Sequence, residues 1–570
     1  MRVSSYCDLV LLNGNVVTVD PTFSVRGALG VLGNTIVAVG RDDEVKPLIG
    51  KDTEVVDLQG KTVLPGINDS HAHTALWAGT KPPIVLDLAY PNVRSVADIK
   101  DAIRTRVASL RPGEWVRGVG WDAGYLAECV RDTGFRLDRG LLDEVAPDNP
   151  VALVDFSVHT LWVNSKALQL AGIDRDTPQP TGGGIEKDAG TGEVTGILRE
   201  FAAENLVMGL VPPLTRAQKR EALAAALDEM SALGITSMTD PALGPGGDSY
   251  QGGLLGSECI GAYQDLLDEG RLKVRVNVLN LFGNYGANSL ADLEGALPRL
   301  GFHSGFGNEK LQIGGIKIFA DGIPPNRTAW MSEEYLGGGS GTLMLPGNSD
   351  EERTRELENM IRFAHVHGFQ VGVHCIGDLA IGATLAGFLK AESEEPRGLR
   401  HYVMHVDFMT PAQAGLAARH GFGVNITPTL PWTISDQLVD IVGLERVKKE
   451  WPYRMIVDAG CHVAASSDAP CTYPSWLQGV QSAVLRESKA TGVVYSSDQC
   501  LTVEEAIQAY TIGGAWQDRQ EHIKGSLEPG KLADLCVLDQ NILAVDPREI
   551  ANVSNVMTVM DGEVVYSPGL

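Results

Sequence analysis

Two histidines separated by a single residue, His71 and His73, have the residue type and the spacing to share a metal ion. They stand in GINDSHAH, a segment with strand character. Side chains two residues apart in a strand leave the same face, so both imidazoles could reach one ion. The spacing alone fits a polar strand end equally well, so the other ligand types in the chain must separate the two interpretations.

A second pair with the same spacing, His365 and His367, provides an internal comparison. It stands in the helix-like segment ERTRELENMIRFAHVHG, which ends at Gly368. Residues two apart on a helix point about 200° apart, so these two side chains cannot converge on one metal. We expect both at the C-terminus of a helix, where the helix dipole favours them.

Further ligand types occupy later strand-like runs. Counted from the run that contains His71, the fourth run contains Lys317 and the fifth ends with His374. The sixth ends with His405 and the eighth with Asp468. Histidine nitrogens and a carboxylate are ligands that suit zinc. Lys317 either forms a buried ion pair or, carboxylated by CO2, bridges two metals through its carbamate oxygens.

Eight apolar runs alternate with helix-like stretches, which is typical of a parallel sheet wrapped by helices. We predict a (β/α)8 barrel over residues 66–519, whose active site lies at the C-terminal ends of the strands. The predicted strand regions are 66–73, 234–240, 274–282, 311–322, 369–378, 401–408, 421–429 and 462–470.

Two additions to the barrel are predicted. About 160 residues separate the first run from the second, far more than a usual loop, so residues of about 80–230 should form an inserted subdomain. Short β-branched runs with hairpin signals at Asn13-Gly14 and Asp561-Gly562 mark the two ends of the chain. Residues 1–65 and 520–570 should therefore build one composite β-sandwich.

Composition excludes several classes of function. The 570 residues hold 72 acidic and 47 basic side chains, a net charge of −25 that disfavours nucleic acid. No apolar run reaches the roughly 18 residues that a membrane span needs, and the start lacks a signal-peptide pattern. The eight cysteines form no CxxC, so neither disulfides nor a thiolate zinc site is indicated. We expect a cytoplasmic homodimer that acts on a small molecule.

Several segments together resemble the amidohydrolase superfamily: VLPGINDSHAH, GGIKIFADG, GVHCIGDLAIG, SSDAPC, LTVEEAIQAYTIGGAW and GSLEPGKLADLCVLD. GVGWDAG (118–124) and HTLWVNSKALQLAGI (159–173) resemble its YtcJ-like branch, amidohydrolase family 3, which includes N-substituted formamide deformylases. The resemblance covers nearly the whole chain. It implies a metal-dependent hydrolase on a (β/α)8 barrel with a sandwich built from both ends, in agreement with the layout above.

The resemblance also implies a role for each candidate ligand. His71 and His73 would bind the more buried metal, with Asp468 facing that metal and the nucleophilic water, and His374 and His405 would bind the outer one. Lys317 would bridge the two metals. The cofactor would be one or two zinc ions per subunit, because this branch varies in metal number and in the modification of the lysine.

The implied reaction is hydrolysis of a C–N bond in a small N-acyl or N-formyl amine. Bound zinc lowers the pKa of its water to about 7, which makes hydroxide available at neutral pH. Asp468, next to that water, would take its proton and pass it to the departing nitrogen.

Five residues are candidates for contact with the substrate. His159 and Arg327 could neutralise the oxyanion, although each could also be structural. Trp121, Tyr125 and Trp432 could form an apolar wall against the amine side, or could be core aromatics.

Two alternatives remain at this stage. A deaminase of a small heterocycle uses one metal and an extra carboxylic acid, and Lys317 favours the amide reaction over it. A catalytically silent binding protein on the same scaffold would have no reason to keep every charged group of the site.

Overall fold

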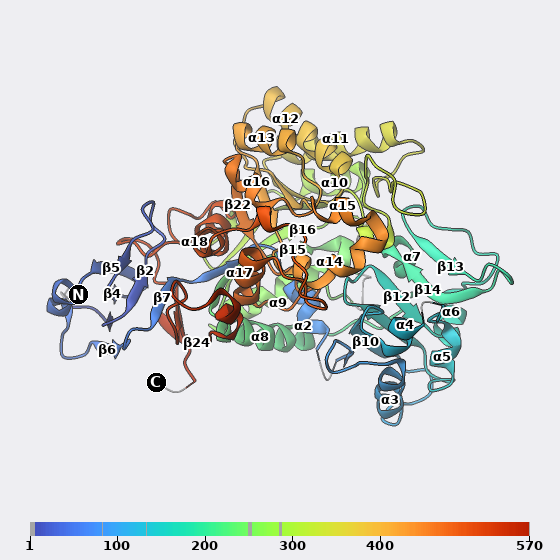
Figure 1. Cartoon of the computed structure of the whole chain (residues 1–570), viewed down its shortest axis with the longest axis horizontal. Helices are drawn as coiled ribbons and strands as arrows, with labels where there is room; N and C mark the ends of the chain where they lie inside the picture. Colours follow the sequence, from blue (N-terminus) through green and yellow to red (C-terminus); the bar gives the residue numbers. More distant parts are fainter. Residues whose placement is uncertain (1–5, 82–83, 133, 249–252, 284–287, 569–570) are drawn as a thin grey trace.

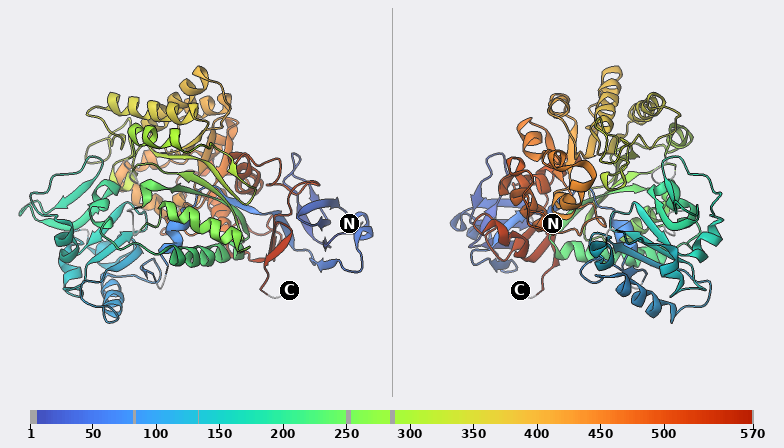
Figure 2. Two further views of the ribbon diagram at one scale, coloured as in Figure 1. Left: turned by 180° about the vertical axis from the view of Figure 1, so that it is seen from behind. Right: turned by 45° about the vertical axis from the view of Figure 1, so that its right-hand side comes forward.

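The computed structural model describes residues 6–81, 84–132, 134–248, 253–283 and 288–568. Three parts follow one another along the longest axis (Figure 1). A β-sandwich built from both ends of the chain lies at one end, a barrel lies in the middle, and the inserted subdomain lies at the other end. The view from behind shows the same order (Figure 2).

Eight parallel strands form the barrel, and each pairs with its neighbours in chain order. All are buried except Gln312 in β18 and the start of β22, as expected for a sheet covered by helices. The barrel is nearly closed, since the Ser70 N–H donates to the Ala465 carbonyl at 3.3 Å. The predicted barrel is confirmed. Its strands are β8 (Ile67–Asp69), β15 (Ile235–Leu243), β16 (Arg275–Asn280), β18 (Leu311–Phe319), β19 (Gln370–Cys375), β20 (Tyr402–His405), β21 (Gly423–Ile426) and β22 (His462–Ala465).

Helices cover the outside of the barrel, and α11 (Asp350–Val366) shows why the sequence forms them. Its N-cap Ser349 accepts a hydrogen bond from the Glu352 N–H, and three acidic residues occupy the first turn. Leu357, Met360, Ile361 and Ala364 recur at helical spacing and are buried. The other long barrel helices are α8 (Arg216–Ala232), α9 (Ser257–Asp268), α12 (Asp378–Glu394), α13 (Pro411–His420), α14 (Thr429–Val442) and α17 (Trp476–Leu485).

Both ends of the chain contribute to the sandwich, as predicted. β7 (Thr62–Pro65) pairs with β23 (Leu535–Leu538), which joins the N-terminal strands to the C-terminal ones in one sheet. That sheet has the order β25 (Glu563–Tyr566), β24 (Asn555–Met560), β23, β7, β2 (Asn15–Val17) and β3 (Val25–Arg26). The facing sheet has the order β5 (Thr35–Gly40), β4 (Ala28–Leu32), β1 (Leu9–Leu12) and β6 (Glu54–Asp57). Leucine, valine and isoleucine side chains from both sheets form a common core. The limits near residues 65 and 520 stay a prediction.

One buried ion pair connects the sandwich to the barrel. Arg275, the first residue of β16, donates to Asp534 at 2.6 and 2.9 Å and to Asp561 at 3.1 Å. The Arg275 and Asp534 side chains are 2% and 4% exposed. Asp561 lies in the turn between β24 (Asn555–Met560) and β25 (Glu563–Tyr566) and has a positive φ of 58°.

The inserted subdomain has its own sheet, in the order β13-β14-β12-β11-β10-β9. It leaves the barrel after α2 (Thr74–Gly79) and returns through α8. Its strands are β9 (Leu86–Asp87), β10 (Val116–Trp121), β11 (Val151–Asp155), β12 (Thr160–Val163), β13 (Gly184–Lys187) and β14 (Val194–Arg199), with α3 (Val96–Val107) among its helices.

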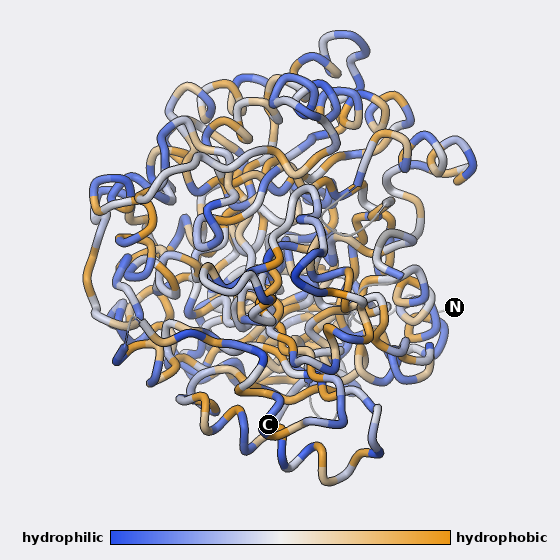
Figure 3. The backbone as a smooth tube through the Cα atoms, turned by 90° about the vertical axis from the view of Figure 1, so that its right-hand side faces the viewer, coloured by the Kyte–Doolittle hydropathy of each residue, from blue (hydrophilic) through white to orange (hydrophobic). Residues whose placement is uncertain are grey.

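Hydrophilic residues mark many of the outer turns and hydrophobic ones many of the inner segments (Figure 3). Among the described residues, no helix has the length and apolar character needed to cross a bilayer.

Candidate metal centre

His71, His73 and Asp468 meet at the C-terminal end of the barrel. One Asp468 carboxylate oxygen lies 3.2 Å from His71 Nε2 and 3.8 Å from His73 Nε2. One donor atom from each residue lies within 4.8 Å of the others, and all three residues are buried. Two nitrogens and an oxygen at this separation can hold one metal ion.

Backbone hydrogen bonds hold these residues together across the closing seam of the barrel. The Asp468 N–H donates to the His71 carbonyl at 2.8 Å, and the His73 N–H donates to the Ala469 carbonyl at 2.8 Å. The preceding Asp69 carboxyl accepts from the N–H and hydroxyl of Ser467 at 2.9 and 2.5 Å. Sequence reasoning missed Asp69, whose only signal is its place two residues before His71.

His374 and His405 extend the site from the neighbouring strands. Their ring centroids are 4.6 Å apart, and the His405 ring is 5.1 Å from that of His71. His405 Nδ1 lies 4.0 Å from the second Asp468 oxygen. His405 and Asp468 have positive φ values of 72° and 56°, so backbone strain is concentrated at this site.

All four histidine side chains are held neutral. Burial lowers the pKa of His71, His73, His374 and His405 well below the usual value for imidazole. A neutral imidazole has a lone pair to offer a metal, whereas a protonated one does not.

Lys317 lies within β18 and is fully buried. Its Nζ contacts the Met404 sulfur at 3.0 Å and lies 4.7 Å from the centre of the Phe319 ring. No ion pair to Lys317 is found among the described residues, so the structure does not support the ion-pair interpretation. Burial lowers the pKa of Lys317 to about 7, so a large fraction of the amine is uncharged near neutral pH.

A divalent metal fits these residues. Both ring nitrogens of His71 are buried and make no hydrogen bond. A buried polar atom without a partner costs free energy, and a bound ion would remove that cost. Imidazole and carboxylate donors are also the set that zinc prefers in catalytic sites.

His159 reaches the site from the inserted subdomain, held by a residue that sequence reasoning missed. Its Nδ1 lies 2.6 Å from a Glu200 oxygen, and its ring centroid lies 6.1 Å from that of His374. The second Glu200 oxygen accepts from Thr328 Oγ1 at 2.6 Å and Asn326 Nδ2 at 3.1 Å. Glu200 stands in an apolar segment without a recognisable motif, so only the structure reveals it.

Glu200 also controls the charge of His159. Burial disfavours the charged imidazole, but the adjacent Glu200 carboxylate, with smaller contributions from Asp155 and Asp468, outweighs this effect and raises the pKa of His159 above its usual value. His159 therefore carries a positive charge more readily than the four histidines around Asp468.

An inner cavity of about 60 Å³ opens onto these groups. His73, His159, His374, His405, Asp407 and Asp468 supply its polar lining, and Phe156, Phe319 and Leu430 are among its apolar residues. Asp407 was not predicted, although it stands only two residues after His405. Burial raises the pKa of both Asp407 and the nearby Glu450.

An outer cavity of about 500 Å³ continues from the inner one and shares Phe156 and Cys471 with it. Its walls come from the barrel mouth and from the inserted subdomain. Trp432 and Tyr125 line this outer cavity, so the structure places both beside the route to the site.

The structure does not support substrate contact for the other two candidates. Trp121 is 4% exposed in the core of the inserted subdomain, where it packs against Trp162 and donates to the Leu153 carbonyl at 2.9 Å. Side chains alternate between the two faces of β10, and Trp121 lies on the face that packs into that core. Arg327 is exposed and lines neither cavity, although the preceding Ile323, Pro324 and Pro325 line the inner one.

The second histidine pair lies at the end of α11, as expected, and is structural. His401 Nδ1 accepts the Val371 N–H at 3.0 Å, so its Nε2 carries the proton and donates to His365 Nδ1 at 2.8 Å. His365 Nε2 then donates to the Glu395 carbonyl at 2.7 Å. Every ring nitrogen of His365 and His401 is therefore in a hydrogen bond, although these two histidines and Glu392 lie close enough together to resemble a set of metal ligands.

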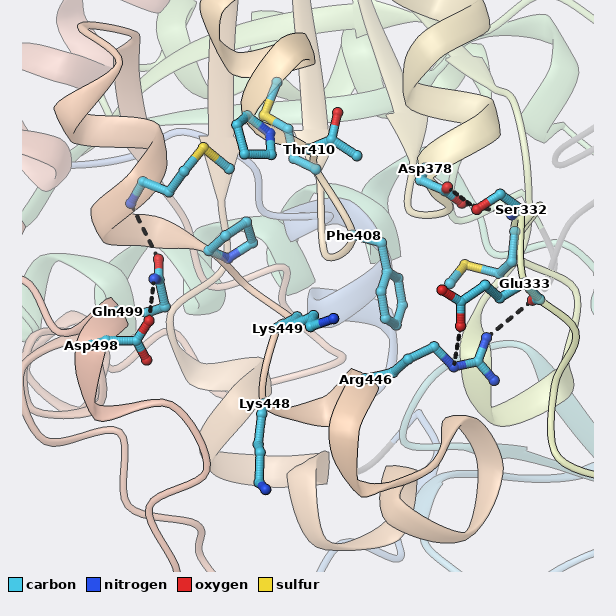
Figure 4. A pocket seen from close by; sticks show the side chains of 15 residues that line it. Ser332, Glu333, Asp378, Phe408, Thr410, Arg446, Lys448, Lys449, Asp498 and Gln499 are labelled. Carbon is cyan, nitrogen blue, oxygen red and sulfur yellow. Dashed lines mark hydrogen bonds and ion pairs between the residues drawn. The ribbon is translucent and has the colours of Figure 1, made fainter.

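A separate cavity of about 360 Å³ lies beside the β20 loop and shares no residue with the inner cavity (Figure 4). Two pairs of its polar residues interact: Ser332 with Asp378, and Arg446 with Glu333. It holds no cluster of metal ligands among the described residues.

Known proteins resemble the chain over nearly its full length. The sequence profile of the amidohydrolase family matches residues 54–566. The putative amidohydrolase YtcJ of Bacillus subtilis is 32% identical, over 95% of this chain and 96% of its own. The N-substituted formamide deformylase of Arthrobacter pascens is 28% identical, over 98% of both chains.

A solved structure shares the fold. An uncharacterized metal-dependent hydrolase from Pyrococcus horikoshii superposes with a TM-score of 0.72 at 24% identity, over 95% of this chain and 99% of that one. The resemblance predicted from the sequence motifs is thus confirmed, and the chain belongs to the amidohydrolase family of hydrolases.

Proposed function

We propose that this protein is a metal-dependent hydrolase that cleaves the C–N bond of a small N-acyl or N-formyl amine. The observation that carries the proposal is the group of four neutral, buried histidines around Asp468 and Lys317 at the mouth of the barrel. The 28% identity to an N-substituted formamide deformylase supports the choice of an amide-type bond.

We assign the metal to zinc, at one or two ions per subunit. His71, His73 and Asp468 would hold the inner ion, and His374 and His405 an outer one. A divalent ion in this position supplies a Lewis acid and lowers the pKa of water enough to provide a nucleophile at neutral pH.

Lys317 would join the two ion positions as a carbamate. Its uncharged amine attacks the carbon of CO2, the nitrogen releases a proton, and the result is a carbamate whose single negative charge is shared by two oxygens. The lowered pKa of Lys317 supplies the uncharged amine that this step needs. The carbamate is favoured by the four histidines and by the absence of an ion pair with another described residue.

Asp468 and His159 would move and neutralise charge during the reaction. The Asp468 carboxylate takes the proton of the attacking water and delivers it to the leaving nitrogen. His159, charged because Glu200 stands behind it, donates through Nε2 to the acyl oxygen as negative charge develops there.

The cavities favour small substrates. The inner cavity has a volume of about 60 Å³ and is enclosed by the inserted subdomain and the barrel loops, so a folded protein could not reach the scissile position. We also keep the cytoplasmic homodimer as a prediction.

The test is a substrate panel on zinc-loaded protein of measured metal content. N-formyl, N-acetyl, lactam, lactone and aminopyrimidine compounds are assayed separately for amine, acid and ammonia. Release of a primary amine and an acid supports the proposal. Ammonia from the aminopyrimidines alone assigns a deaminase, and binding without any turnover assigns a silent binding protein.

A further inference from the structure

A lysine in the outer cavity is held by aromatic rings rather than by a carboxylate. Lys489 lies after α17, and its backbone N–H donates to the Trp432 carbonyl at 2.7 Å. Its Nζ is 4.9 Å from the centre of the Trp432 ring, 5.1 Å from that of Tyr125 and 5.3 Å from that of Tyr90. All three distances are within the range of a cation–π interaction.

Two of the three aromatic rings around Lys489 also stack on each other. Tyr90 and Tyr125 stack with their centroids 4.7 Å apart, and both belong to the inserted subdomain. Trp432 comes from α14 of the barrel. The Lys489 ammonium is therefore fixed where the subdomain and the barrel face each other, on the wall of the cavity that leads to the metal centre.

Other charged groups of the outer cavity already have partners. Lys81 pairs with Glu229, which also accepts from the Tyr473 hydroxyl at 2.8 Å. Asp87 accepts from the Ala89 N–H at 3.0 Å and from Asn92 at 2.8 Å.

Asp122 is the carboxyl that influences Lys489. It accepts from the Gly124 N–H at 2.8 Å and from the Gln437 side chain. Burial lowers the pKa of Lys489, and Asp122 opposes this shift without forming an ion pair with the lysine. Within the part of the chain that the structure describes, Lys489 is the one lysine of this cavity that makes no ion pair.

We propose that Lys489 binds a carboxylate group of the substrate, so that the preferred substrates are small amides bearing an acid group, such as N-acyl or N-formyl amino acids. The inference rests on the proposed function and names its substrate class. A single ammonium matches a single negative charge. The Asp87, Asp122 and Glu229 carboxyls of the same cavity would repel a dianion such as a phosphate ester.

The experiment compares acids with their neutral counterparts. The N-formyl and N-acetyl derivatives of one amino acid are assayed beside the corresponding amino acid amides, which replace the carboxylate with a carboxamide. A hydrogen bond between charged groups contributes about tenfold or more. We therefore expect kcat/KM to favour the acids at least tenfold in the wild-type enzyme, and Lys489→Met to remove that preference.

Two further variants complete the test. Lys489→Arg keeps the charge and should keep the preference for acids. Lys51→Met removes an exposed lysine of the sandwich and should leave the ratio unchanged. Equal kcat/KM for acid and amide in the wild type, or an unchanged ratio in Lys489→Met, would overturn the proposal.

A binding measurement separates this proposal from the proposed function. If no amide is hydrolysed, the proposed function fails, and calorimetry on zinc-loaded protein then measures the affinity for the same acids and amides. Tighter binding of the acids that Lys489→Met abolishes would support the role of Lys489 without any turnover. Equal affinity for acids and amides would refute it.

Discussion

At the residue scale, the site combines four histidines that burial keeps neutral with one histidine, His159, whose positive charge is favoured by an adjacent carboxylate. The four histidines around Asp468 are neutral because they are buried, whereas His159 has Glu200 behind it and favours the charged form. These two environments suit two tasks, since a ligand needs a lone pair and an oxyanion needs a proton donor.

Asp468→Asn tests the proton transfer. The amide keeps the shape of the side chain but cannot accept the proton, and general acid–base assistance contributes about 10²–10⁴-fold. We expect kcat to fall by at least that factor. Metal content is measured alongside, and a near-normal kcat in metal-loaded protein would assign the proton transfer to another residue.

Glu200→Gln tests the positioning of His159. Removing the carboxylate should lower activity about 10–100-fold, the effect typical of losing the partner behind a metal-bound histidine, since Glu200 orients His159 in the same way. Because Glu200 raises the pKa of His159, the charged imidazole persists to a higher pH in the wild type. The alkaline limb of the kcat/KM profile should therefore move to lower pH in the variant.

The exposed Glu193 provides the control for Glu200, since Glu193→Gln removes a carboxylate from the same subdomain. An identical pH profile in Glu200→Gln and wild-type protein would mean that Glu200 has a structural role only.

Lys317→Met tests the bridging lysine. Methionine has a similar volume, so the buried position in β18 remains filled, but it cannot form a carbamate. We expect fewer zinc ions per subunit by elemental analysis, with a smaller effect on the unfolding midpoint. Full metal occupancy in the variant would favour a single ion held without the lysine.

At the element scale, the carboxyl ends of strands gather the ligands, and this is why the sequence predicted so much of the site. Apolar runs identified all eight barrel strands, and His374, His405 and Asp468 could be placed at strand ends by counting. Glu200 and Asp407 escaped prediction because their neighbours come from other elements. Trp121 was predicted to line the substrate pocket, but its side chain lies in the core of the inserted subdomain, because β10 packs its inner face there and the sequence does not show this.

Arg275→Met tests how the sandwich is attached to the barrel. It would leave the Asp534 carboxylate buried without its partner, and breaking a buried ion pair typically costs about 3–5 kcal/mol. Urea unfolding should show a loss of this size. Arg271→Met, which removes an exposed ion pair with Glu221, should change the free energy of unfolding by less than about 1 kcal/mol.

At the scale of the whole molecule, the metal centre joins segments from opposite ends of the chain. His71 follows the first barrel strand, β8, and Asp468 follows the last, β22. Backbone hydrogen bonds join these two strands only in part, so an ion bound between His71 and Asp468 would help to close the barrel. The inserted subdomain contributes His159 to the same site and Tyr90 and Tyr125 to the cavity outside it.

Metal removal should therefore affect stability as well as turnover. A ligand that binds only the folded state stabilises it by RT ln(1 + [L]/Kd), which is about 4 kcal/mol at a free concentration of 1,000 Kd. We expect chelation to abolish activity and to lower the melting temperature, and added zinc to restore both. The double variant His71→Asn/His73→Asn should melt at the same temperature with and without zinc. Full activity in protein shown by elemental analysis to be free of metal would contradict the proposed mechanism, because Asp468 and His159 alone cannot supply the Lewis acid that it requires.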